Sequence, residues 1–107
     1  MKFEIITIDL FKKQFKKLQK KYKSLKTDIE RLATELIENP ELGTSLGKDC
    51  YKVRLAIKSK GKGKSGGARV ITYIKVIDNK IYLLTIYDKS ERNSISDKEL
   101  KDILKQL

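Results

Sequence analysis

Apolar residues recur at alternating steps of four and three through the first third of this chain, and this repeat constrains the fold more than any other feature. The repeat consists of Phe11, Phe15, Leu18, Tyr22, Leu25, Ile29, Leu32 and Leu36. Such spacing places the apolar side chains on one stripe of an α-helix. The helical region should begin at Asp9, a residue type suited to the N-cap, and should end at Asn39-Pro40.

Two arrangements of this helical region satisfy the pattern. A single helix over residues 9–39 would be roughly 45 Å long at about 1.5 Å per residue, which is long for a small domain. We favour a helical hairpin that is broken near Lys23 and Ser24, with Ser24 or Thr27 capping the second helix. The unbroken repeat, with no glycine or proline at the break, favours the single helix, and a coiled-coil dimer would also explain it.

The rest of the chain alternates between runs typical of strands and short connections. The strand-like runs occupy residues 3–7, 50–57, 68–77 and 80–87. Asp78-Asn79 should form a tight turn, residues 41–49 a connecting loop, and Ser96 with Glu99 a capping box that begins a last helix. The predicted order is β-α-α-β-β-β-α. This is an α+β fold in which an antiparallel sheet carries an N-terminal helical hairpin and a C-terminal helix.

The composition excludes several kinds of site. The chain has 107 residues, which should form one domain over residues 1–107, and it has no histidine. Its one cysteine, Cys50, should be a small core residue at the start of a strand. A serine–histidine triad and the usual zinc sites are therefore excluded, and we expect no metal and no cofactor. Since no apolar run could span a membrane or serve as a signal peptide, we expect a cytoplasmic protein.

Positive charge is clustered along the chain, whose formal net charge is +11. Residues 48–69 hold eight basic residues and one acid, and residues 12–26 hold eight lysines and no acid. A rigid array of cations suits a polyanion such as RNA. The lysine loop, residues 58–67, should be a flexible hairpin loop, and it lacks the spacing and the following helix of a nucleotide-binding P-loop. The lysines expected to neutralise RNA phosphates there are Lys58, Lys60 and Lys62.

Three cations of the predicted sheet should converge on one face. Lys52 and Arg54 lie two residues apart in a strand, and Arg69 follows on the next strand across the hairpin. Arginine can donate two parallel hydrogen bonds to a phosphate, and a lysine crowded by like charges can act as a general base. The alternative is a set of solvated side chains on an open sheet. Tyr87, at a strand end, could stack on a base, act as an acid or simply pack.

Several segments together resemble the RelE/ParE toxin superfamily. DCYKVRL is followed, after an insertion, by ARVITYIKVIDNKIYLLTI, and KSERNSISDKELKDIL is similar in spacing to the end of RelE-like toxins. GKSGGARVITY with YDKSE also looks like the HigB-type branch of the superfamily. The resemblance covers the whole chain, and the predicted order of elements is that of the family. It rests on the combination of these segments, because no single motif is sharp.

This resemblance implies the toxin of a type II toxin–antitoxin system. RelE-like toxins are ribosome-dependent endoribonucleases, or mRNA interferases, that cut mRNA in the A site without a metal. The 2′-hydroxyl attacks the adjacent phosphate while basic side chains do the acid–base and electrostatic work. On this resemblance Lys52 and Arg54 are functional basic positions, and Arg69 stabilises the phosphate. The implied partners are a cognate antitoxin that shields the basic groove, the ribosome with its mRNA, and operator DNA bound only through the antitoxin.

Two family positions are occupied by serine in this chain. Counting back from the C-terminus without gaps, Ser90 stands where a second catalytic arginine is expected, and Ser96 where a catalytic tyrosine is expected. Lys89 and Tyr87 are the candidate substitutes, and Lys64 of the inserted loop is our first choice as a general base. The alternatives are a ParE-like inhibitor of DNA gyrase, whose relatives generally lack a complete basic set, and a non-catalytic RNA-binding or ribosome-binding domain.

Overall fold

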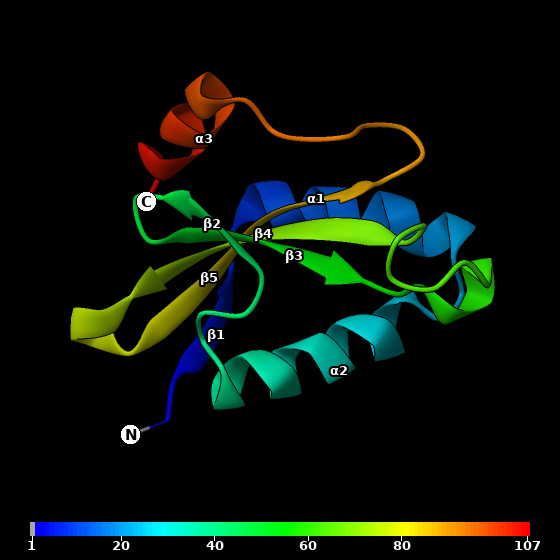
Figure 1. Ribbon diagram of the computed structural model, residues 1–107, viewed down its shortest axis with the longest axis horizontal. Coiled ribbons are helices and arrows are strands. Elements are labelled where there is room, and N and C mark those ends of the chain that lie inside the picture. The colour runs from blue at the N-terminus through cyan, green and yellow to red at the C-terminus, as the bar shows by residue number, and fades with distance from the viewer. Residues whose placement is uncertain (1) are drawn as a thin grey trace.

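A computed structural model describes residues 2–107 of the chain (Figure 1). The elements are β1 (Glu4–Thr7), α1 (Asp9–Lys21), α2 (Leu25–Glu38), β2 (Thr44–Gly47), β3 (Cys50–Leu55), η1 (Lys58–Lys60), β4 (Ala68–Lys75), η2 (Val76–Asp78), β5 (Lys80–Asp88) and α3 (Asp97–Leu104), where η1 and η2 are short 3₁₀ turns. All strands belong to one sheet with the order β1-β5-β4-β3-β2. Strands β2 to β5 form an antiparallel meander, and β1 pairs with β5 in parallel. The predicted α+β fold is confirmed.

The helical region is a hairpin, as predicted, because α1 ends at Lys21 and α2 begins at Leu25. A residue far along the sequence stabilises the break, since the backbone N–H of Ser24 donates to the hydroxyl of Ser59 at 3.3 Å. One detail of the prediction is wrong, because Ile8 rather than Asp9 occupies the N-cap of α1. Ser24, one of the two predicted residues, occupies the N-cap of α2, although its side chain makes no capping hydrogen bond. No helix within residues 2–107 has both the length and the apolar character that a bilayer span requires.

Each face of the sheet carries an apolar cluster. Helices α1 and α2 cover one face, where their stripe residues pack on β3, β4 and β5. Helix α3 covers part of the other face, where Leu100 and Ile103 pack against Cys50 and Ile71 (Figure 1). Cys50 is fully buried, and burial raises the pKa of its thiol to about 11, which agrees with the predicted core role. Ser96 begins α3 as predicted and accepts the Glu99 N–H at 3.1 Å.

The prediction of a loop over residues 41–49 is wrong, because Thr44–Gly47 form strand β2 and pair with β3. The two strands are joined by a turn in which Lys48 (φ 54°) and Asp49 (φ 61°) both adopt the left-handed conformation. Such a turn matches the twist of a two-residue hairpin, but it usually contains glycine or asparagine. The sequence therefore carries no clear turn signal here, and the short strand was missed for that reason.

Candidate functional site

Three adjacent strands align the central candidate residues in a row across the sheet. Arg54 of β3 lies opposite Arg69 of β4, and Arg69 lies opposite Tyr87 of β5. Residues directly opposite each other in antiparallel strands project from the same face. That face is the one on which α3 packs, since Tyr87 belongs to the α3 cluster. Lys52, two residues before Arg54, projects from the same face. Lys52, Arg54 and Arg69 therefore project from one face of the sheet.

An open hollow of about 210 Å³ lies beside this row and is lined by Lys52, Arg54 and Lys64. It is also lined by Glu35 of α2, by Leu42 and Gly43 before β2, and by Thr44 at the start of β2. Arg54 and Lys64 are exposed, and Lys52 is half-buried. Within residues 2–107, Glu35 is the only acidic side chain that lines the hollow. These three cations come from β3 and the lysine loop, and they are placed to meet an anion from solvent.

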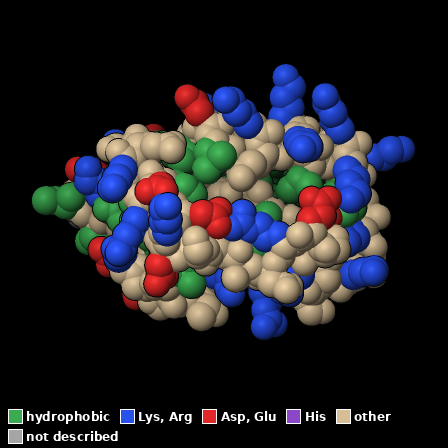
Figure 2. Space-filling model, turned by 90° about the horizontal axis from the view of Figure 1, so that it is seen from above, with side chains coloured by type: hydrophobic (Ala, Val, Ile, Leu, Met, Phe, Trp, Pro, Cys, Tyr) green, Lys and Arg blue, Asp and Glu red, His purple; other side chains and the backbone are tan. Residues whose placement is uncertain are grey.

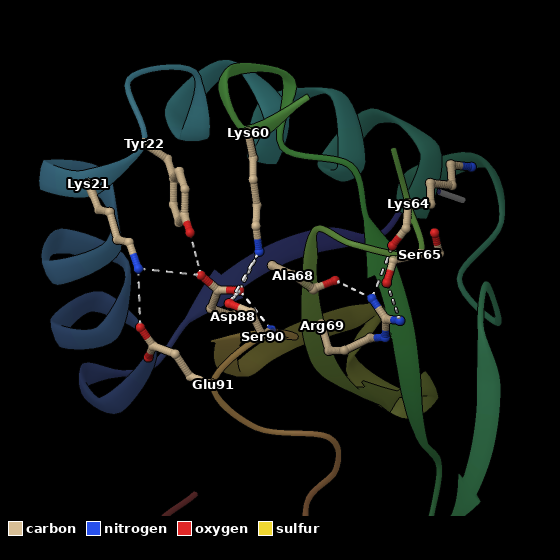
Figure 3. Close-up of polar contacts among 10 residues, drawn as sticks. All are labelled: Lys21, Tyr22, Lys60, Lys64, Ser65, Ala68, Arg69, Asp88, Ser90 and Glu91. Atoms are coloured by element: carbon tan, nitrogen blue, oxygen red, sulfur yellow. Dashed lines mark hydrogen bonds and ion pairs between the residues drawn. The ribbon is translucent and has the colours of Figure 1, made fainter. Parts of the chain in front are cut away.

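Arg69 is placed differently from these cations, because only 5% of it is exposed. Its guanidinium donates to the carbonyl oxygens of Lys64 (3.1 Å), Ala68 (3.1 Å) and Ser65 (3.3 Å), as Figure 3 shows. Burial and then the nearby charge of Arg54 lower the pKa of the Arg69 guanidinium. Arg69 thus holds the end of the lysine loop through these hydrogen bonds. It also adds a buried positive charge opposite the exposed Arg54.

Tyr87 closes the row on β5 and is 7% exposed. Its hydroxyl is buried and has no hydrogen-bond partner among the described residues. Burial raises the pKa of the Tyr87 phenol, although the charges of Arg92 and Arg69 oppose this. The Arg92 guanidinium lies 5.3 Å from the centre of the Tyr87 ring and also pairs with Glu99. Sequence analysis did not identify Arg92, because counting back from the C-terminus without gaps placed the expected arginine at Ser90, two residues earlier.

The lysine loop makes polar contacts at both of its ends, through Lys60 at the start and through Arg69 at the end. Lys60 is not a free loop cation, because its Nζ lies 2.6 Å from Asp88 Oδ1 and its side chain is 11% exposed. Lys58 and Lys62 are exposed, as an RNA-binding role requires. Lys89 is half-buried, and its ammonium donates to Asn93 at 2.5 Å.

Asp88 is a buried acid that sequence reasoning missed. Burial by itself would raise the pKa of its carboxyl, but hydrogen bonds from Lys60, Tyr22 and Ser90 outweigh burial and hold the pKa well below its ordinary value. A hollow of about 440 Å³ opens beside it, between α1 and residues 86–92, and is lined by Lys17, Lys21 and Arg92 among others. Figure 2 shows cationic side chains standing out around the margin of one face of the molecule, with a few acidic ones between them.

Comparisons with known proteins point to one family. The family model described as the RelE toxin of the RelE / RelB toxin–antitoxin system matches residues 8–107. The fold is similar to that of a free double arginine-to-alanine mutant of E. coli toxin RelE, with a TM-score of 0.68, 14% identity, and coverage of 100% of this chain and 99% of that one. The isolated E. coli RelE toxin in a P21 crystal form gives a TM-score of 0.62 at 15% identity, with 100% of both chains covered.

Proposed function

This chain belongs to the RelE toxin family of toxin–antitoxin systems, and from that premise we propose that it is a ribosome-dependent, metal-independent endoribonuclease that cleaves mRNA in the A site. The observation that carries the proposal is the row of Arg54, Arg69 and Tyr87 across the sheet, with Lys52 and Lys64 beside it. A concentrated, fixed set of cations stabilises a phosphate that gains negative charge during cleavage.

The proposed reaction is an internal transfer at phosphorus. A base removes the proton of the ribose 2′-hydroxyl, the 2′-oxygen bonds to the adjacent phosphorus, and the bond from phosphorus to the 5′-oxygen breaks. The 5′-oxygen takes up a proton, so the products are a 2′,3′-cyclic phosphate and a free 5′-hydroxyl. No external reactant is consumed in this step. The protein has to supply a proton acceptor, a proton donor and positive charge around the phosphate.

The side chains of the site divide among these roles by their exposure. Lys52 and Arg54 line the open hollow and would stabilise the phosphate directly. Lys64 shares that hollow, and it is the proposed general base. Arg69 already donates its hydrogen bonds to carbonyl oxygens of the loop, so it would stabilise the phosphate through its charge and not through direct contact. Tyr87, near the end of β5, and Lys89, which follows that strand, are the candidates for the proton donor.

We include the ribosome because the hollow is open and does not enclose a nucleotide, so the RNA has to be held in place by something else. An RNA strand that is held elsewhere would be presented to the cations in a fixed geometry, and fixed geometry lowers the barrier strongly. The exposed Lys58, Lys62 and the lysines of residues 12–26 provide the charge for docking on ribosomal RNA. The cognate antitoxin of this family would cover the same cations, and the site of action would be the cytoplasm.

One observation favours a second candidate, a non-catalytic RNA-binding or ribosome-binding domain. Arg69 is buried and hydrogen-bonded to the loop, and Tyr87 is 7% exposed, so neither presents itself freely to a substrate. In such a domain each cation would contribute a graded, salt-dependent share of affinity, roughly one counterion per contact. The two candidates therefore differ in whether changing a single cation affects the rate of cleavage or only the affinity.

The test uses purified protein, ribosomes and a defined mRNA that is being translated. We expect cleavage within the A-site codon and 5′-hydroxyl products that polynucleotide kinase labels without prior phosphatase treatment. The same mRNA without ribosomes is the control and should stay intact. Intact mRNA on translating ribosomes would contradict the proposal. A ParE-like function would then appear as inhibition of DNA supercoiling by gyrase, and the binding-domain function as salt-dependent ribosome binding alone.

A further inference from the structure

A cluster of polar side chains lies outside the proposed chemistry, at the junction of α1, the lysine loop and the end of β5 (Figure 3). We call Asp88, Lys60, Tyr22 and Ser90 the Asp88 cluster. Asp88 is 1% exposed, and its carboxylate accepts hydrogen bonds from Lys60 Nζ at 2.6 Å and Tyr22 Oη at 2.5 Å. Ser90 donates from its N–H at 2.9 Å and from its hydroxyl at 2.7 Å. The four bonds use both carboxylate oxygens, so the carboxylate is fixed in place.

The start of the lysine loop is also attached to the helical hairpin. The N–H of Ser59 donates to the Ser24 hydroxyl at 2.8 Å, and the N–H of Lys58 donates to the carboxylate of Asp28 at 3.2 Å. Asp28 is fully buried and also accepts the Ser24 hydroxyl at 2.7 Å. The first three residues of the loop are therefore held by α2 and by Asp88.

The end of the loop is attached to the sheet. Arg69 holds the carbonyl oxygens of Lys64 and Ser65, as described above. Gly67 passes so close to β3 that a β-carbon on it would lie 2.0 Å from the carbonyl oxygen of Leu55. A side chain at this position would clash with the β3 backbone, which cannot shift easily. The loop can therefore pass this close to β3 only with glycine at position 67. Lys64 therefore extends from a segment with a defined course, and its side chain lines the same hollow as Arg54.

We propose that Lys60 and Asp88 are positioning residues: their buried ion pair fixes the lysine loop so that Lys64 faces the hollow with Lys52 and Arg54. This proposal rests on the proposed ribonuclease function and adds to it. A lysine on a mobile glycine-rich loop would sample many positions, whereas an anchored one is already oriented when RNA arrives. Lys60 then acts through the loop and does not contact the RNA. Its burial and its short bond to Asp88 are the reasons for removing it from the RNA-binding set.

The test compares Lys60→Met and Tyr22→Phe with the wild-type protein. Lys60→Met removes the ion pair between Lys60 and Asp88 and leaves Lys21 Nζ at 3.9 Å from the Asp88 carboxylate. Tyr22→Phe removes one hydrogen bond to Asp88 while keeping the charges of Lys60 and Asp88. The matched control is Lys75→Met, which removes the same charge from an ion pair with Asp78 (3.0 Å) that is exposed and lies at the β4–β5 turn. Hydrogen exchange is measured at the amides of Gly61 and Gly67, and cleavage of ribosome-bound mRNA is measured as kcat and KM.

We expect Lys60→Met to accelerate exchange at Gly61 and Gly67 by about tenfold or more, because the local opening no longer breaks the ion pair. Its kcat should fall by roughly 10-fold to 100-fold through misplacement of Lys64, with KM within about twofold of wild type. Tyr22→Phe should give the same pattern on a smaller scale, and it carries the test if Lys60→Met does not fold. The control should match wild type in both measurements.

Two results would overturn the proposal. One is unchanged exchange at both glycines in the two variants, which would mean that the cluster does not hold the loop. The other is faster exchange with an unchanged kcat, or with a change in KM alone, which would mean that the loop position does not matter for cleavage. If the wild-type protein cleaves no mRNA, the proposed function fails on its own, and the exchange data still decide whether the cluster anchors the loop.

Discussion

Replacing Asp88 with asparagine should destabilise the protein by about 3–5 kcal/mol, the range found when one partner of a buried ion pair is removed. The side chain of Asp88 is fully buried, and that of Lys60 is 11% exposed. Asparagine keeps the shape but loses the charge, so the Lys60 ammonium stays buried without a counter-charge. Hydrogen bonds to a charged group are worth about 1 kcal/mol more than those to a neutral one. With four such bonds at Asp88, this reasoning gives the same magnitude.

The assay is equilibrium unfolding in urea at pH 7, in which the midpoint should fall while the slope m stays constant. Asp78→Asn is the matched control, because its partner Lys75 is exposed and the ion pair is open to solvent. Breaking that pair should cost at most about 1 kcal/mol. A loss of less than about 1 kcal/mol for Asp88→Asn, similar to the control, would refute the reasoning. It would show that the buried ion pair contributes little more than a surface one.

Three further predictions concern pH, the loop return and the thiol. The pKa of Asp88 is lowered in the folded state, so its contribution is complete above the unfolded pKa of about 3.9 and is lost as pH falls below that value; the urea midpoints of wild type and Asp88→Asn should therefore converge below pH 4, and a constant gap would contradict the assignment. Gly67→Ala should cost about 1–3 kcal/mol in the same assay, because its β-carbon would lie 2.0 Å from the Leu55 carbonyl oxygen; wild-type stability would show that the close approach is relieved freely. Cys50, with its thiol pKa raised to about 11 by burial, should resist a disulfide reagent at pH 8 until urea unfolds the protein, and rapid reaction in the folded state would contradict its place in the core.

The parts of the fold that repeat with a regular period could be predicted from the sequence. The apolar stripe predicted the helical region and the alternating strands predicted the central meander, because burial of one face imposes that period. The hairpin was favoured for a different reason, since a single helix over residues 9–39 would be long for a small domain. The same alternation placed Lys52 and Arg54 on one face, and the hairpin between β3 and β4 brought Arg69 opposite Arg54. Local periodicity was sufficient for these contacts, since each depends on neighbours along one strand or across one turn.

The contacts that hold the lysine loop could not be predicted from local periodicity. Lys60 and Asp88 are 28 residues apart, and Tyr22 and Asp88 are 66 residues apart. No period relates them, and in the sequence Lys60 looks the same as the exposed Lys62. The glycines of the loop do not reveal their role in the sequence either, because Gly67 allows a close approach between two backbones that only the tertiary fold creates. Charged residues in a glycine-rich segment can thus be buried when the tertiary fold supplies a partner.

The most direct test of the central claim, that the sheet cations catalyse cleavage and do not merely bind RNA, is single-turnover cleavage by Arg54→Met. Arg54 is exposed, lines the hollow and sits opposite Arg69, so its removal should leave the fold intact. At saturating protein on mRNA-programmed ribosomes, we predict that the cleavage rate constant falls by about 100-fold or more, as expected for loss of a group that stabilises transition-state charge. The affinity for ribosomes should change by no more than about threefold. An unchanged rate constant at saturation, with weaker binding alone, would contradict the account.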